Sequence, residues 1–240
     1  MAYLPVLTYH RLLAQDPTVR ADPQRISVSQ KQFRGHLRWL RRLGYQTIGL
    51  DDYVKKLRSG LTTGGRTFAI TFDDGYEEVL TLGLPILREF GYMATVFAVS
   101  GEDHNRWDDG RARLMSDEDL RAWRQAGMEV GAHSGHHDHL PQVPLEAARK
   151  DLKDCKARLE SVLGNPILTL AYPYGESTPA VEAAVRDAGF NAAFATDRAP
   201  ADHAQNHYRL RRVVVFPRNT PWEILMKVQR WYPTYQDWKR

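Results

Sequence analysis

Short apolar runs alternate with amphipathic stretches along almost the whole chain. The apolar runs are rich in β-branched and aromatic residues and stop at polar or glycine-containing turns, a pattern that predicts buried strands. We expect strands at PVLTYH (5–10), YQTIGL (45–50), TFAITF (67–72), MATVFAVS (93–100), MEVGAH (128–133), ILTLAY (167–172), FNAAFAT (190–196) and RRVVVF (211–216).

The stretches between these runs carry apolar residues at helical spacing. In residues 28–45, Leu37 and Leu40 share one face, Ser29 is a candidate N-cap and Gly44 ends the pattern. Further helices are expected at Leu145–Leu163 before Gly164, at 178–188 before Gly189, and after the capping pattern Thr220, Pro221 and Glu223. The alternation predicts parallel strands around a central sheet or barrel, in a single α/β domain over residues 1–240.

Composition narrows the function class. The chain of 240 residues is 42% hydrophobic and 26% charged, and it lacks an apolar run near the length that a membrane span needs, so we expect no transmembrane helix. Residues 1–13 do not resemble a signal peptide, which favours a cytoplasmic or membrane-peripheral protein, or an exported one if a leader has been removed.

The positive residues behind the net charge of +4 are scattered along the chain, so no nucleic-acid partner is expected. The single cysteine, Cys155, is expected to be a structural thiol.

Candidate chemistry gathers where the expected strands end. Parallel α/β folds place their reactive side chains at the carboxyl ends of the strands. The polar residues at these ends are Asp73 and Asp74, His133 followed by His136, His137 and His139, the turn YPYG (172–175), and His10. The polar segment 101–115 is the longest connection, and it forms either a loop over this site or an ordinary surface excursion.

Two adjacent aspartates at the end of a buried strand need open solvent or a cation, because like charges repel and are costly to desolvate. Histidines and a carboxylate from different strands suit a cation such as Zn²⁺, with a coordination position left open for water. His133 and His137 can face one ion if their segment coils into a turn. The alternatives are that Asp73 and Asp74 cap a helix, and that the histidines form a surface cluster.

TFDDGY, HSGHH followed by DHL, and AYPYG resemble the first three motifs of the NodB-type polysaccharide deacetylases, carbohydrate esterase family 4. The resemblance implies a distorted (β/α)7 barrel that removes acetyl groups from N-acetylated sugars with a divalent metal. It implies that Asp74, His133 and His137 bind the ion, most simply Zn²⁺ with Co, Ni, Fe or Mn as alternatives. Asp73 would be the general base, and the backbone N–H of Tyr174 would hold the oxyanion. His136 and His139 are expected outside the ligand set.

The chain also departs from that family pattern. Ala171 stands where the third motif usually has arginine, and no leucine-x-histidine motif follows Phe216. Both departures resemble the permuted members that deacetylate poly-N-acetylglucosamine in biofilm matrices, and the resemblance assigns the acid role to His10 and the arginine role to Arg212. For His10 the alternative is a core histidine bonded to a backbone carbonyl. Asp197, at another strand end, is a candidate for orienting a catalytic group.

The sequence therefore predicts a metal-dependent hydrolase that removes acetate from an N-acetylhexosamine-containing polysaccharide, such as an exopolysaccharide of the poly-N-acetylglucosamine type. Two alternatives stay open: a deacetylase of a small or lipid-linked N-acetyl sugar, and a catalytically silent glycan-binding domain. The aromatic residues near the carboxyl end can stack on sugars, touch a membrane or cover the base of the barrel, and we leave them out of the site; they are Trp222, Trp231, Tyr232, Tyr235 and Trp238.

Overall fold

The computed structural model describes residues 3–16, 22, 25–61, 63–107, 112–196, 199–200 and 202–238. The strands are β1 (Val6–Tyr9), β2 (Leu12–Leu13), β3 (Val28–Ser29), β4 (Gln46–Thr47), β5 (Thr67–Phe72), β6 (Thr95–Ala98), β7 (Glu129–Ala132), β8 (Thr169–Ala171), β9 (Ala192–Ala195), β10 (Leu210–Arg211) and β11 (Val213–Val214). The helices are α1 (Gln30–Arg42), α2 (Leu50–Arg58), α3 (Leu84–Phe90), α4 (Asp117–Gln125), α5 (Leu145–Leu163), α6 (Pro179–Asp187), α7 (Pro221–Lys227) and α8 (Tyr232–Trp238), with a π-helical turn at Val79–Gly83 and a 3₁₀ turn at Pro173–Gly175.

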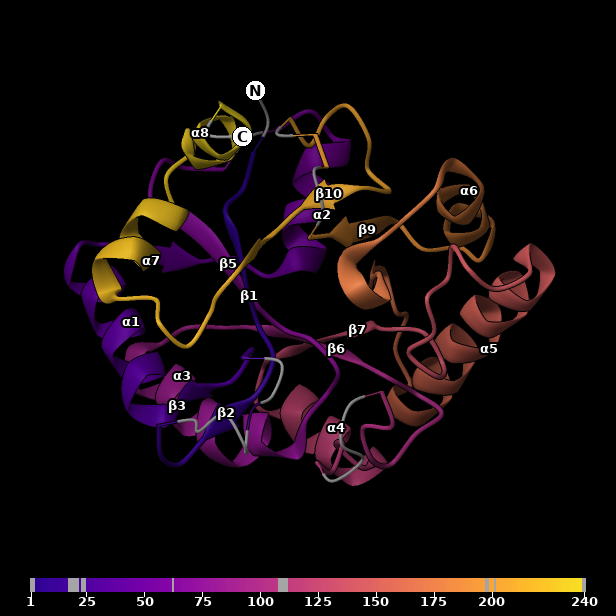
Figure 1. Ribbon diagram of the computed structural model, residues 1–240, viewed down its shortest axis with the longest axis horizontal. Coiled ribbons are helices and arrows are strands. Elements are labelled where there is room, and N and C mark those ends of the chain that lie inside the picture. Colours follow the sequence, from indigo (N-terminus) through magenta and orange to yellow (C-terminus); the bar gives the residue numbers. More distant parts are fainter. Residues whose placement is uncertain are drawn as a thin grey trace.

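The main strands form a parallel barrel that the last strand segment closes. The order runs β10-β9-β8-β7-β6-β5-β1-β11, and every pairing along it is parallel. β10 pairs with β9 and β11 pairs with β1, while Arg212 alone separates the two segments. The broken β10–β11 segment thus joins both edges of the sheet and completes the expected distorted (β/α)7 barrel. In Figure 1 the strands occupy the middle, with α1 and α7 on one side and α5 and α6 on the other.

One end of the barrel is filled by a helix. The buried face of α2, which includes Leu50, Tyr53 and Val54, packs with barrel residues such as Val6 and Leu210 in one apolar cluster. Burial of this face in the barrel leaves the opposite end, where the strands finish, free for side chains with chemical roles. The larger apolar cluster lies between the strands and the outer helices.

Two aromatic rings meet in the inner apolar cluster of the barrel. Phe97 of β6 and Phe194 of β9 lie with their ring centroids 5.8 Å apart. A Cβ atom at Gly131 would stand 2.5 Å from the Phe97 ring, so only glycine at this position of β7 leaves room for it. Close packing of this kind makes the barrel a rigid support for the residues at its open end.

Several expected elements match the structure closely. α5 spans Leu145–Leu163 and ends at Gly164 in the left-handed conformation, α1 begins after the capping box of Ser29, and α7 begins after that of Thr220. Of the described residues, no helix combines the length and the apolar character that crossing a membrane requires.

The strand expected at 45–50 is wrong in extent. Only Gln46–Thr47 is extended there, and it pairs with the start of β5 outside the barrel ring. Leu50 instead begins α2, because the carboxylate of Glu129 on β7 accepts the Leu50 N–H at 2.6 Å and the Asp51 N–H at 3.4 Å. A side chain distant in sequence thus supplies the cap that Gly49 cannot provide.

Candidate metal centre and active site

The barrel brings the predicted site residues to the ends of neighbouring strands. Asp73 and Asp74 follow β5, His133 follows β7, Tyr174 lies in the turn after β8, and His10 follows β1. Asp73, Asp74, His133 and His137 are all buried. The sequence expectation that strand ends collect these groups therefore corresponds to one compact region of the structure.

Asp74 lies against both candidate histidine ligands. Its Oδ1 atom is 3.2 Å from Nε2 of His133 and 3.2 Å from Nε2 of His137. Ligand atoms of the three residues all lie within 4.8 Å of one another. One carboxylate oxygen and two imidazole nitrogens converging on one point form a donor set that suits Zn²⁺ and similar divalent ions.

The tautomer of His133 supports this interpretation. Its Nδ1 atom is 2.8 Å from the carbonyl oxygen of Ala171, and a carbonyl can only accept, so Nδ1 carries the proton. A neutral His133 then turns the Nε2 lone pair toward the Asp74 carboxylate. Two electron-rich atoms at 3.2 Å require a positive charge between them, either a proton or a metal ion. The residues present therefore fit a divalent cation.

The electrostatics of the site agree with a cation-binding role. Burial alone would raise the pKa of Asp74, but its hydrogen bonds with His133 and His137 hold the pKa well below the usual value. Burial would lower the pKa of His133, and the two aspartates outweigh it and raise that pKa. Burial lowers the pKa of His137. Asp74 therefore stays ionised, and positive charge in this site is favoured close to His133.

Asp73 is fixed by a different partner. Each of its carboxylate oxygens accepts one hydrogen bond from Arg212, at 2.6 Å from Nη1 and 2.7 Å from Nη2. Nη1 of Arg212 also donates to the Thr71 hydroxyl at 3.2 Å. Burial would raise the pKa of Asp73, but Arg212 and then His133 outweigh it and lower the pKa. The structure thus gives Arg212 a specific contact: it orients an ionised Asp73.

His10 lies half-buried beside the two aspartates. A positive charge on it lowers the pKa of both Asp73 and Asp74, which places its ring within electrostatic reach of the site. Its Nδ1 atom is buried and has no hydrogen-bond partner within the described part of the chain. A core histidine held through Nδ1 by a backbone carbonyl would have such a partner, so the structure does not favour that alternative.

The backbone of the site is unusually strained. Positive φ angles occur at Asp74 (73°), Ser134 (64°), His137 (59°) and Tyr174 (59°). Non-glycine residues rarely adopt this region, and such strain clusters at functional sites because the surrounding structure must hold it. Gly175, at φ 71°, has no room for a side chain, since its Cβ would stand 1.8 Å from Oγ1 of Thr196.

The other histidines of the cluster lie outside the ligand group. His136 is exposed and its Nδ1 contacts Glu102 at 2.9 Å. The His139 ring stacks on that of Tyr174, with centroids 3.5 Å apart and an interplanar angle of 3°. Tyr174 is 42% exposed, so this pair forms part of the rim of the site. Asp197 lies outside the described residues.

One site residue was not singled out from the sequence. Trp107 stacks on His137, with ring centroids 4.1 Å apart and an interplanar angle of 23°. It belongs to the polar segment 101–115, which was expected to be either a loop over the site or a surface excursion. In the sequence, the one feature that could have pointed to Trp107 was that an aromatic residue stands within a polar segment. The stack on His137 places this part of the segment at the site.

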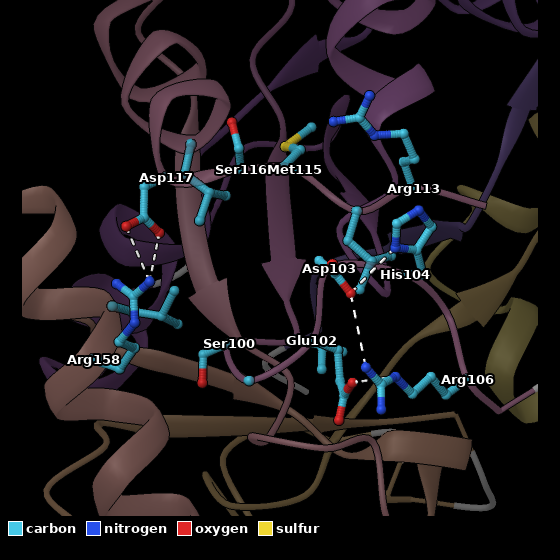
Figure 2. Close-up of a pocket in the computed structure, with 15 residues that line it drawn as sticks. Ser100, Glu102, Asp103, His104, Arg106, Arg113, Met115, Ser116, Asp117 and Arg158 are labelled. Carbon is cyan, nitrogen blue, oxygen red and sulfur yellow. Dashed lines mark hydrogen bonds and ion pairs between the residues drawn. The ribbon is translucent and has the colours of Figure 1, made fainter. Parts of the chain in front are cut away.

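A separate cavity of about 680 Å³ lies beside the same segment, between residues 99–106, the start of α4 and Arg158 of α5 (Figure 2). Its described lining includes none of the predicted site residues. The charged groups around it are largely paired with each other, as in the contacts of Arg158 with Asp117 at 2.8 Å and Arg106 with Glu102 at 2.8 Å. The catalytic candidates therefore belong to the barrel end and not to this cavity.

Solved structures with the same fold are known. The structure superposes on the Streptococcus pyogenes deacetylase PplD in complex with acetate with a TM-score of 0.84 and 21% identity. The superposition covers 95% of this chain and 99% of that chain. The structure of IcaB from Ammonifex degensii gives a TM-score of 0.80 and 25% identity over 95% of this chain and 98% of that one. These matches confirm the barrel architecture expected from the sequence.

Sequence comparisons give the family. The Bacillus subtilis (strain 168) protein YxkH is 25% identical over 90% of this chain and 72% of its own length. The poly-beta-1,6-N-acetyl-D-glucosamine N-deacetylase of Staphylococcus aureus (strain MRSA252) is 24% identical over 79% of this chain and 68% of its own length. The sequence profile of the polysaccharide deacetylase family matches residues 60–193, which is more than half of the chain. This match confirms the resemblance noted in the motifs, and the chain belongs to the polysaccharide deacetylase family.

Proposed function

We propose that this polysaccharide deacetylase uses a divalent cation, most simply Zn²⁺, to hydrolyse the acetamide group of N-acetylhexosamine residues in a glycan and release acetate. The observation that carries the proposal is the convergence of Asp74, His133 and His137 on one point, beside an ionised Asp73. A divalent ion held there supplies Lewis acidity that polarises a carbonyl group and lowers the pKa of water. The protein residues around it supply the proton transfers and the orientation.

Asp73 is the proposed general base. Its lowered pKa keeps it unprotonated at neutral pH, and Arg212 fixes the plane of its carboxylate. Each carboxylate oxygen has two lone pairs, and Arg212 occupies one on each, so a further lone pair remains to take a proton from the attacking water. A fixed orientation matters because proton transfer requires the base within hydrogen-bond reach of its substrate.

His10 is the proposed general acid. A deacetylation must protonate the leaving amine, and imidazole titrates near neutral pH. The position of His10 after β1, within electrostatic reach of both aspartates, supports this role. Tyr174 is proposed to donate its backbone N–H to the oxyanion that forms on the acetyl carbonyl, and the strained turn at Pro173–Gly175 would hold this donor in place.

We propose an exopolysaccharide of the poly-N-acetylglucosamine type as the substrate. The staphylococcal relative named as a poly-beta-1,6-N-acetyl-D-glucosamine N-deacetylase supports this class. The replacement of the usual motif arginine by Ala171, with Arg212 contacting Asp73 from another strand, also supports it. Arg212 reaches Asp73 because it lies at the point where the last strand segment closes the barrel.

The test measures acetate release from β-1,6-linked and β-1,4-linked N-acetylglucosamine oligomers and from the free sugar. The protein is assayed as prepared, after chelation, and after Zn²⁺, Co²⁺ or Mn²⁺ is added back. We expect release that chelation abolishes and the metal restores, with the β-1,6-linked oligomers preferred. Preference for the free sugar would contradict the substrate class. Metal-loaded protein that binds oligomers and releases no acetate would show a silent glycan-binding domain.

A further inference from the structure

The two histidines of the candidate metal group are supported differently. Histidines that bind metals usually donate the N–H of their other ring nitrogen to a carboxylate, a carbonyl or water, which fixes the ring orientation. His133 follows this rule through Ala171, with a distance of 2.8 Å from Nδ1 to the carbonyl oxygen. Nδ1 of His137 is buried and has no hydrogen-bond partner among the residues that the structure describes. Among the described residues, contacts other than a hydrogen bond at Nδ1 therefore support this side of the His137 ring.

Aromatic rings enclose His137. Trp107 stacks on its face, with centroids 4.1 Å apart and an interplanar angle of 23°. The Tyr174 ring meets it nearly edge-on, with centroids 4.7 Å apart and an angle of 61°. The backbone of His137 is also held, because its N–H donates to the Ser134 hydroxyl at 2.9 Å. The side chain itself is thus positioned by ring contacts, of which the Trp107 stack covers one face.

Trp107 is in turn held by an anchored segment. His104 and Arg113 form an antiparallel bridge, so the chain just before Trp107 lies beside the chain that leads into Leu114. Asn105 is fully buried and exchanges hydrogen bonds with Ala112, one through its backbone N–H and one through its Oδ1, both 3.0 Å long.

This segment is attached to the strand end that carries the aspartates. Nδ2 of Asn105 lies 3.4 Å from the hydroxyl of Tyr76, and Tyr76 forms an antiparallel bridge with Leu114. Tyr76 stands two positions after Asp74. The indole of Trp107 and the carboxylate of Asp74 therefore belong to one connected unit, with His137 against both of them.

We propose that Trp107 is a positioning residue that orients His137 toward Asp74 by stacking, in a place where no described residue bonds to the Nδ1 atom of His137. The inference rests on the proposed function, since it requires that Asp74, His133 and His137 bind a cation. Loss of the stack frees the His137 ring to rotate away, because nothing among its described neighbours bonds to Nδ1. Metal affinity then falls while the fold is kept.

The experiment compares Trp107→Phe with Trp107→Leu. Phenylalanine keeps an aromatic face against His137, whereas leucine fills space without one. Trp39→Ala is the control, because Trp39 lies 46% exposed on the outer helix α1. Affinity for Zn²⁺ and Co²⁺ is measured by competition with a chromophoric chelator, and the visible absorption of the Co²⁺ form reports the ligand geometry. Thermal unfolding of the metal-free proteins checks that each variant folds.

We expect Trp107→Leu to bind the ion about 10- to 100-fold more weakly, the range typical for loss of a group that supports a metal ligand. Its Co²⁺ spectrum should change, while Trp107→Phe and Trp39→Ala stay close to the native protein. Unchanged affinity and spectrum in Trp107→Leu, with only a raised KM for glycan, would assign Trp107 to substrate binding and overturn the proposal. Equal losses of metal affinity in Trp107→Phe and Trp107→Leu would also overturn the proposal. A native protein that binds no ion would refute the proposed function itself.

Discussion

The guanidinium of Arg212 donates two hydrogen bonds, of 2.6 and 2.7 Å, to the carboxylate of Asp73, although the two residues are 139 positions apart in the sequence. Arg212 is the residue between β10 and β11, where the chain passes from pairing with β9 to pairing with β1. The same residue thus lies at the closure of the barrel and fixes the proposed base. Its side chain is fully buried, so the pair is shielded from water.

Replacing Arg212 by Met should destabilise the protein by about 3–5 kcal/mol, because it leaves the buried carboxylate of Asp73 without its two hydrogen bonds to a positively charged group. Urea unfolding at constant pH measures this. In the double variant Arg212→Met/Asp73→Asn the unpaired charge is gone, and much of the lost stability should return while activity stays absent. Strictly additive losses in the double variant would contradict a direct coupling between the two residues.

Asp73→Asn and Asp74→Asn should lose different properties, the first turnover and the second metal binding. We expect Asp73→Asn to retain its metal and to lose at least about 100-fold in kcat, since it removes the proposed base. Asp74→Asn should lose metal, because it removes a charged ligand. Metal content after desalting and acetate release distinguish the two variants, and circular dichroism checks their folding. Equal loss of metal in both would refute the division of roles between the aspartates.

His10→Ala should lower kcat by about 100-fold or more through loss of the proposed acid, with metal content unchanged. Small N-acetyl sugars and polymers should be affected alike, because the missing proton is needed at the leaving amine of either. Steady-state kinetics on both substrates test this. Near-normal turnover would return His10 to a structural role.

Stability should depend on pH through Glu129, which caps α2 at the closed end of the barrel. Burial, and then the charge of Asp51, raises the pKa of Glu129 from 4.5 to about 7. A carboxyl group with a raised pKa in the folded state contributes stability that is complete below about 4.5 and is lost as the pH rises through about 7. We therefore expect ionisation of Glu129 to lower the Tm as the pH rises from about 4.5 to about 7.

Glu129→Gln should remove that contribution and flatten the curve of Tm against pH between about 4.5 and 7. Glu118→Gln, on the exposed side of α4, is the matched control and should leave the curve as it is in the native protein. Scanning calorimetry over this pH range makes the measurement. An unchanged slope in Glu129→Gln would contradict the raised pKa.

The sequence by itself determined the elements and the ends at which chemistry gathers. Helix caps such as Ser29, Thr220 and Gly164, and the strand before Asp73, follow from local patterns, because a cap or a buried strand depends on residues close in sequence. The motif resemblance added the family, which the comparisons confirm, and candidate roles for the site residues, which stay predictions.

Only the tertiary structure decided how these elements meet. The hydrogen bonds of Arg212 to Asp73, the cap that Glu129 gives to α2, and the stack of Trp107 on His137 each join segments distant in sequence. No local pattern records such contacts, since they depend on how the barrel is assembled and on where Trp107, after β6, comes to lie. The parallel order of the strands brings ligand atoms of Asp74, His133 and His137 within 4.8 Å of one another, and that proximity turns a set of polar residues into a candidate metal centre.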